Sequence, residues 1–297
     1  MRFIFFYSII ILGEIMLVSN WEDYKILKTS KGMKLESWKN IKLLRPDPVI
    51  TWDLGDFDYK DINAVYHRSN TGGGHWENLK KTPESWTVNY KNLKFLLKEM
   101  GFKHTGLFPE QGINWDFAMD KIKNANREIK VLNLFAYTGA ATVACLSAGA
   151  SVTHVDSSKG MIEWAKENVK LNHLEDKNIR YLVDDVVKFV QREIRRGNKY
   201  DAIIMDPPSY GRGANGEVWA LENDLENLIK LCKEILNDNF LFVIINTYST
   251  NLPSISLENI LKINFNNKKV IVDDLCLPIE NSNLYLPCGI TGRVSNE

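Results

Sequence analysis

The stretch VLNLFAYTGAATVACLSAGASVTHVD, from Val131 to Asp156, decides the fold of this chain. It begins with a short apolar run typical of a buried parallel strand, which Tyr137-Thr138-Gly139-Ala140 interrupts where the backbone must turn sharply. Small apolar residues up to position 148 predict a helix packed closely on a sheet, with Gly149 as its stop. A second strand then ends at Asp156, near the spacing at which such folds present a carboxylate to a ribose. The stretch therefore predicts a site for a nucleoside cofactor.

The same strand and helix pattern continues towards the C-terminus. Ser157-Ser158 can cap a helix, and apolar runs predict further strands at 179–183, 200–205 and 240–246, with helices at 186–196 and 221–236. Two last strands, near 270–275 and 283–286, are close enough in sequence to be antiparallel. Alternating units of this length predict a doubly wound, mostly parallel sheet with helices on both faces.

Polar residues stand at four successive strand ends of this predicted sheet: Asp156, Asp184-Asp185, Asp206 and Asn246. Ligands bind beyond the carboxyl ends of such strands, so four polar ends in succession predict a site. The turn holds one glycine rather than GxGxxG, which gives little support to a pyrophosphate cradle. S-adenosyl-L-methionine, which keeps ribose and adenine without phosphates, fits better. We expect its ribose to meet Asp156 and its adenine amino group to donate to Asp184 or Asp185.

Four motifs occur in order along the chain: Phe135-x-Tyr137-Thr138-Gly139, Val155-Asp156-Ser157-Ser158, Asp184-Asp185 and Asp206-Pro207-Pro208-Ser209-Tyr210. Together they resemble the class I S-adenosylmethionine-dependent methyltransferases, and more narrowly the bacterial group related to large-subunit ribosomal RNA methyltransferases of the RlmI/RlmK type. The resemblance runs from about Trp21 to the end of the chain. It implies a Rossmann-like sheet and methyl transfer, and it is much less specific for the substrate.

The resemblance also implies a cofactor role for a segment like Phe108-Pro109-Glu110-Gln111. From spacing alone, Glu110 and Gln111 could equally cap the helix that follows. The expected cofactor-binding residues are Phe108, Glu110, Gln111, Asn133, Phe135, Tyr137, Thr138, Gly139, Asp156, Ser157, Asp184, Asp185 and Asp206.

The proline-containing segment after the strand at 200–205 has a restricted backbone that suits a binding site. Its prolines remove two backbone donors and fix φ, and Asp206 can then accept a hydrogen bond from an amino group. Tyr210 can stack on a planar base extruded from its helix. We therefore expect Asp206, Pro207, Pro208 and Tyr210 to be catalytic; the alternative is a plain proline turn. Residues 211–216 predict a flexible segment over the substrate, with Arg212 as a phosphate contact.

Carbon methylation of cytosine would need a cysteine nucleophile. In related cytosine-C5 enzymes that cysteine lies just beyond the strand matching 240–246, where this chain has Asn246-Thr247-Tyr248-Ser249-Thr250. Cys145 and Cys232 fall within predicted helices, and Cys288 near the last strand is better explained as structural. The sequence therefore favours methylation of a base nitrogen in RNA, with ribosomal RNA as partner. A small-molecule or protein substrate, 5-methylcytosine formation and a non-catalytic binding module remain open alternatives.

Residues 20–104 predict a small β-rich domain ahead of the methyltransferase domain at 105–297. Short alternating runs between turn residues predict hairpins and a small antiparallel sheet, and a further strand is expected at Thr105–Phe108 before a helix from about Trp115. Lysines interleaved with tryptophans suit an RNA-facing surface, but most tryptophans are better explained as core. His67 and Arg68, beside the glycine run, are the exceptions.

Bulk composition limits the remaining possibilities. The formal net charge of zero does not by itself indicate nucleic acid, and four scattered cysteines without CxxC favour a reduced cytoplasmic protein without a zinc site. The apolar run Phe3–Leu12 is too short to span a bilayer, and no A-x-A-like cleavage site follows it. We therefore expect residues 1–19 to be an apolar leader or a mis-assigned start before Met16, and we expect no stable membrane association.

Overall fold

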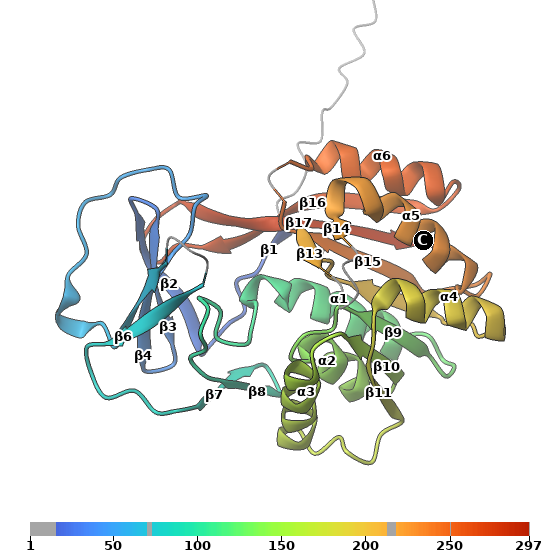
Figure 1. The fold of residues 1–297 in the computed structure, drawn as a ribbon, viewed down its shortest axis with the longest axis horizontal. Helices are drawn as coiled ribbons and strands as arrows, with labels where there is room; N and C mark the ends of the chain where they lie inside the picture. Colours follow the sequence, from blue (N-terminus) through green and yellow to red (C-terminus); the bar gives the residue numbers. More distant parts are fainter. Residues whose placement is uncertain (1–15, 70–72, 213–217, 250, 297) are drawn as a thin grey trace, which may run out of the picture.

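The computed structural model describes residues 16–69, 73–212, 218–249 and 251–296. Figure 1 shows a small β lobe beside a larger α/β body, with the hairpin β16–β17 reaching from the body towards the lobe. The strands are β1 Met16–Leu17, β2 Tyr24–Ser30, β3 Met33–Trp38, β4 Ile41–Pro46, β5 Ala64–Arg68, β6 Gly74–Asn78, β7 Trp86–Tyr90, β8 Leu93–Leu97, β9 Lys130–Leu134, β10 Ser151–Asp156, β11 Ile179–Val183, β12 Ala202–Met205, β13 Tyr210–Arg212, β14 Val218–Ala220, β15 Phe242–Thr247, β16 Lys269–Pro278 and β17 Tyr285–Ser295. The helices are α1 Gly112–Lys123, α2 Ala140–Ser147, α3 Lys159–Leu171, α4 Val186–Arg196, α5 Leu221–Glu234 and α6 Ser254–Asn264, with 3₁₀ turns η1 Tyr59–Asp61 and η2 Pro109–Gln111.

An eight-stranded sheet forms the centre of the body, in the order β1-β16-β17-β15-β12-β9-β10-β11. The strands from β15 to β11 are parallel, whereas β17 runs antiparallel to both β15 and β16. This confirms the mostly parallel, Rossmann-like sheet with an antiparallel last strand. Because β9 lies between β10 and β12, the chain order reverses there, and a crevice opens at such a point.

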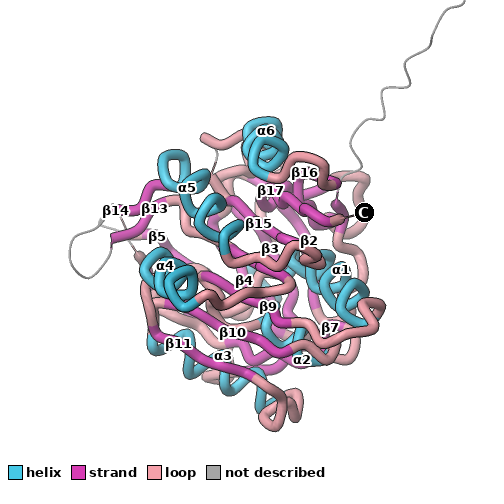
Figure 2. Tube along the Cα trace, turned by 90° about the vertical axis from the view of Figure 1, so that its right-hand side faces the viewer, coloured by secondary structure: helices cyan, strands magenta, loops and turns pink. Residues whose placement is uncertain are grey.

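Two apolar cores lie on the two faces of this sheet. Helices α1, α2 and α3 cover one face and α4, α5 and α6 cover the other, as Figure 2 shows from the side. Strands β12 and β15 have buried side chains along their whole length, as expected of strands covered on both faces. Their continuous apolar runs are why these strands could be recognised in the sequence.

Local capping sets the helix ends. The Ser158 hydroxyl accepts a hydrogen bond from the Met161 N–H at the start of α3, and the Asp185 carboxylate accepts one from the Lys188 N–H at the start of α4. Helix α4 ends at Gly197, whose φ of 68° is the left-handed conformation that glycine adopts without a steric penalty. The predicted helix at 186–196 matches α4 at both ends.

The small lobe contains the predicted hairpins as a five-stranded sheet, β2-β3-β4-β5-β6. Trp21 and Trp38 are buried, and Trp52, Trp76 and Trp86 are partly buried against the same core, so the core interpretation of these tryptophans is confirmed. The hairpin β7–β8 pairs only with itself among the described strands and packs on α3 of the body. The expected boundary at residue 104 therefore lies beyond a hairpin that contacts the body.

Several segments differ from the sequence prediction. Helix α6 was not expected, and β4 and β5 pair in parallel within a lobe sheet that was expected to be antiparallel. The strand expected at Thr105–Phe108 is wrong, because Gly106 has a φ of 103° and the segment pairs with no described strand. Met16 and Leu17, within the range expected to be a leader, form β1 beside β16, and the rest of the apolar run lies outside the described residues. Gly211 and Arg212 of the predicted flexible segment belong to β13, which forms a ribbon with β14, whereas 213–216 lie outside the described residues.

Candidate active site

A cavity lies at the carboxyl ends of the central strands, at the point where strand order reverses. Its empty volume is about 440 Å³ and it is open to solvent. It brings together seven of the residues expected from the sequence, namely Phe108, Gln111, Asn133, Phe135, Tyr137, Thr138 and Asp206. The other lining residues are Gly106, Leu107, Trp115, Ala136, Ala140, Ala141, Ile204 and Asn246. Of the four predicted polar strand ends, Asp206 and Asn246 therefore line the cavity where the fold predicts a ligand.

The turn after β9 is held in a strained form. Gly139 has a φ of 82°, and a Cβ built there would lie 2.8 Å from the Ala165 Cβ of α3. Phe135 and Tyr137 also have positive φ, at 53° and 51°, which is uncommon for residues with bulky side chains. Such strain persists only where the surroundings impose it, and it is concentrated at ligand sites.

Asp156 closes this turn from the end of β10. One carboxylate oxygen accepts from the Tyr137 N–H at 2.8 Å, and the other accepts from the Ser158 N–H at 2.8 Å. Burial raises the pKa of Asp156, and these two bonds oppose the rise. Ser157, between them, is exposed. Asp156 therefore holds the turn, and each of its oxygens keeps a lone pair for a ligand.

The two acidic residues after β11 have protein partners. Asp184 forms an ion pair with Arg192, and the Asp185 carboxylate caps α4. Neither residue lines the cavity, and Gly139, Asp156 and Ser157 also lie outside its lining. The capping of α4 would be sufficient reason for an aspartate at position 185.

Two carboxyl groups, Asp206 in the cavity lining and Glu110 outside it, are close enough to interact electrostatically. Glu110 is buried, which raises its pKa, and Asp206 has its pKa raised to about 8 by burial and then by the neighbouring Glu110. Two like charges in an apolar site cannot both ionise easily, so the protein disfavours a charge on Asp206 when the site holds no cation. A ligand that brings a positive charge would relieve that penalty.

Tyr248 lies against two lining residues, Gln111 and Phe108, and the sequence analysis missed it. The Gln111 Nε2 donates to the Tyr248 Oη at 2.7 Å, and the Phe108 ring lies between those of Tyr248 and Tyr137, with centroids 5.7 and 5.6 Å away. Asn114 joins Gln111 to Asn246 through donor bonds of 2.9 Å each. A tyrosine directly after the end of β15 was the available signal in the sequence.

A buried chain of hydrogen bonds orients Asn133 within the cavity. Its Nδ2 donates to the Thr142 Oγ1 at 2.9 Å, and the Thr142 hydroxyl lies 2.9 Å from the His154 Nδ1. Burial lowers the pKa of His154 to about 3, so its ring is neutral and Nδ1 can accept the hydroxyl proton. Asn133 therefore has its amide nitrogen occupied, and its oxygen is left for a ligand.

The proline turn after β12 places the remaining expected residues. Pro207 is buried and Pro208 is exposed, and the carbonyl of Pro208 accepts from the Trp219 Nε1 at 2.6 Å. That carbonyl is therefore bound to the β13–β14 ribbon. Tyr210 begins the ribbon and is 56% exposed. Tyr210 follows Asp206 closely in the sequence, but only Asp206 lines the cavity.

The cysteines offer no activated thiol within the described residues. Burial raises the pKa of Cys145 to about 12 and that of Cys276 to about 11, and it raises those of Cys232 and Cys288 as well. A nucleophilic cysteine needs the opposite shift. Across the described ranges there is also no cluster of three or more His, Cys, Asp or Glu side chains fit to hold a metal, and no helix long and apolar enough to cross a membrane.

Known methyltransferases resemble this chain in sequence and in fold. The family model described as S-adenosylmethionine-dependent methyltransferase matches residues 63–268. The crystal structure of the SAM-dependent methyltransferase from Agrobacterium tumefaciens is 32% identical, with a TM-score of 0.91 over 96% of this chain and 94% of that one.

Curated relatives are named Ribosomal RNA large subunit methyltransferase K/L. The protein from Syntrophotalea carbinolica is 29% identical over 67% of this chain and 28% of its own length. The protein from Shewanella sp. (strain ANA-3) is 31% identical over 75% of this chain and 31% of its own length. The chain thus matches less than a third of the length of either relative. The family match over most of the chain, together with the site described above, shows that this protein belongs to the S-adenosylmethionine-dependent methyltransferases.

Proposed function

We propose that this enzyme methylates a base nitrogen in RNA, with ribosomal RNA as substrate. The observation that carries this proposal is Asp206, a carboxyl with a pKa of about 8 that lines the cofactor cavity directly after β12. It offers an acceptor to the amino group of a base, while none of the described thiols has a pKa suited to attack on carbon. The relatives named as ribosomal RNA methyltransferases support RNA as the substrate.

The cavity suits S-adenosylmethionine, and the residues in and around it divide by chemistry. We assign the ribose to Asp156 and the adenine amino group to Asp184 or Asp185, as expected from the sequence. Glu110, Gln111 and the oxygen of Asn133 then provide polar partners for the amino-acid end. The remaining contacts in this proposal come from Phe108, Phe135, Tyr137, Thr138, Gly139, Ser157 and Asp206.

When bound, S-adenosylmethionine supplies a methyl group on a positively charged sulfur. Glu110 and Asp206 provide negative charge beside it, and the positive charge should favour the ionised form of Asp206. Asp206 then accepts from the base amino group and holds its nitrogen in line, so that the main contributions are positioning and electrostatics. Pro207 and Pro208 fix the backbone that carries Asp206, and Tyr210 stacks on the base as it enters.

Transfer of tritiated methyl groups to ribosomal RNA from a strain lacking the gene tests this function. We expect the wild-type enzyme to label the RNA, and mass spectrometry of the nucleosides to show the methyl group on a base nitrogen. Asp206→Ala should lower the rate by about a hundred-fold or more, the usual loss of a transition-state partner. Asp176→Ala, which removes an exposed carboxylate, is the matched control.

The outcomes separate the parts of the proposal. Label in a ribosomal protein instead of RNA would reject the substrate, and label on cytosine C5 would reject the nitrogen. If Asp206→Ala were as active as Asp176→Ala, the role of Asp206 would be wrong. Calorimetry with S-adenosylmethionine checks that each variant still binds the cofactor.

A further inference from the structure

The loop from Gly101 to His104 joins the small lobe to the mouth of the cofactor cavity. On the lobe side, the Arg45 Nη1 donates to the Lys103 carbonyl at 2.8 Å, and the Tyr66 hydroxyl lies 3.5 Å from the Gly101 carbonyl. On the cavity side, the ring of His104 lies 5.0 Å from that of Phe108, which lines the cavity. A ligand held by this loop would therefore lie beside the methyl-transfer site.

Positive charge collects around this loop. Arg45 is paired with Glu36 at 2.6 Å and Lys34 with Asp47 at 3.0 Å, so both of these cations are compensated. Among the described residues, neither Lys103 nor Arg68 at the end of β5 forms an ion pair with a carboxylate. Burial lowers the pKa of Lys103; the charge of Asp47, which already pairs with Lys34, opposes this effect, and the charges of Lys34, Arg45 and Arg68 add to it. A partly buried cation among other cations is favoured by an incoming anion.

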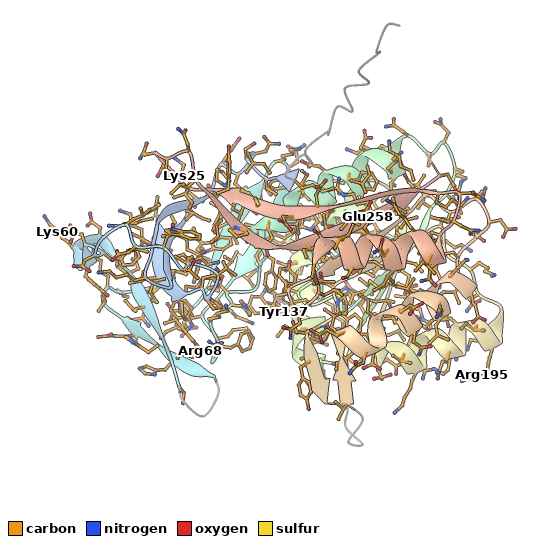
Figure 3. The ribbon with its side chains drawn as sticks, turned by 90° about the horizontal axis from the view of Figure 1, so that it is seen from above. Lys25, Lys60, Arg68, Tyr137, Arg195 and Glu258 are labelled. Carbon is orange, nitrogen blue, oxygen red and sulfur yellow. The ribbon has the colours of Figure 1, made fainter. Side chains whose placement is uncertain are left out.

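An aromatic ring accompanies these two cations. Phe102 precedes Lys103, is 37% exposed, and lies 6.1 Å from the ring of His104. Exposed aromatic rings beside cations are the combination that proteins use for single-stranded nucleic acid, because bases stack on the rings while phosphates meet the cations. Figure 3 shows Arg68 between Lys60, at the outer end of the small lobe, and Tyr137 in the body.

We propose that Arg68, Phe102 and Lys103 form the RNA-contacting surface of the small lobe. The two cations bind backbone phosphates next to the target nucleotide, and Phe102 stacks on a neighbouring unpaired base. The target base can then enter the cavity towards Asp206. This proposal rests on the proposed function and identifies the residues that would give it RNA affinity independently of the cofactor.

The cations can be tested by the salt dependence of binding. With the full chain and a short fluorescent single-stranded oligoribonucleotide, Arg68→Ala and Lys103→Ala should each make the slope of log K against log salt shallower by about 0.7. Both variants should raise the KM for ribosomal RNA from the deletion strain and leave kcat and the affinity for S-adenosylmethionine unchanged. Lys103→Arg keeps the positive charge and should therefore have the same salt slope as the wild type. Lys60→Ala, an exposed lysine of the same lobe, is the control.

Removal of the Phe102 ring should change the affinity for RNA but not its salt dependence. Phe102→Ala should weaken RNA binding about five-fold or more, with an unchanged salt slope, because it removes stacking and no charge. If Arg68→Ala and Lys103→Ala matched Lys60→Ala in slope and KM while the wild type labelled RNA, this surface would be wrong and the function would stand. If the wild type labelled only protein, both proposals would fall.

Discussion

At the scale of single residues, the site depends on groups whose properties are set by distant neighbours. Asp206 owes its raised pKa to burial and to Glu110, which is far from it in the sequence. Gly139 is required by α3 rather than by a phosphate group, since a Cβ there would meet Ala165. The single glycine that distinguished this turn from a pyrophosphate cradle therefore has a packing reason.

The raised pKa of Asp206 predicts how stability changes with pH. Its pKa rises from 3.8 to about 8 on folding, so the cofactor-free protein should lose stability as pH rises through this range, because only the unfolded state ionises freely. Asp206→Asn removes this loss. Its stability relative to the wild type should increase by more than about 1.4 kcal/mol between pH 5 and pH 8, the equivalent of one pKa unit.

Urea unfolding at both pH values measures this difference. Asp176→Asn, at an exposed position, should show no such dependence on pH. A stability difference between Asp206→Asn and the wild type that stays the same at both pH values would contradict the proposed burial effect.

At the scale of elements, Asn168 of α3 joins the hairpin β7–β8 to the cofactor turn. Its Oδ1 accepts from the Leu96 N–H and its Nδ2 donates to the Thr138 carbonyl, each at 2.8 Å. Thr138 in turn donates to the Gly106 carbonyl at 2.6 Å. One asparagine thus fixes the hairpin to the turn, and the threonine of that turn holds the chain that leads to Phe108.

Replacing Asn168 should therefore cost more than replacing its neighbour one turn later. Asn168 is fully buried, so Asn168→Ala leaves two backbone groups without partners and should lower the free energy of unfolding by about 2–4 kcal/mol. Asn172 makes equivalent bonds to the N–H and carbonyl of Lys94 at an exposed position. Asn172→Ala should cost less than about 1 kcal/mol because water replaces those bonds. Equal losses in urea unfolding would show that burial of Asn168 is not the cause.

At the scale of the whole molecule, one apolar core extends across the small lobe and the body. Trp21 packs edge-on against Trp38 of the lobe and against Trp115 of α1, with ring centroids 6.4 and 6.0 Å apart. The Trp21 Nε1 also donates to the Pro109 carbonyl at 2.9 Å. The hairpin β16–β17 contributes Leu277 and Leu286 to the same core. The two parts are therefore joined by buried apolar contacts.

This shared core predicts that the body does not fold without the lobe. A fragment of residues 105–297 should lack near-ultraviolet circular dichroism and bind a hydrophobic dye, because Trp115 loses its aromatic neighbours. The full chain should unfold in one calorimetric transition, with matching calorimetric and van't Hoff enthalpies. Two separate transitions, or a fragment that unfolds cooperatively, would contradict this.

The sequence by itself determined most of the alternating strands and helices of the body, though not α6, and the nature of the cofactor. Apolar runs, caps at Ser158 and Asp185, and the stop at Gly197 are local signals, and local signals set element boundaries. The polar strand ends could be recognised as a site because parallel strands bring their carboxyl ends to one edge.

Only the tertiary structure decided which residues meet within that site. The effect of Glu110 on the pKa of Asp206, the place of Tyr248 and the Asn133–Thr142–His154 chain join elements far apart in the sequence. The same holds for Thr105–Phe108, which has the pattern of a strand but no described neighbour to pair with. Pairing, burial and pKa depend on contacts across the fold, and no local pattern in the sequence encodes them.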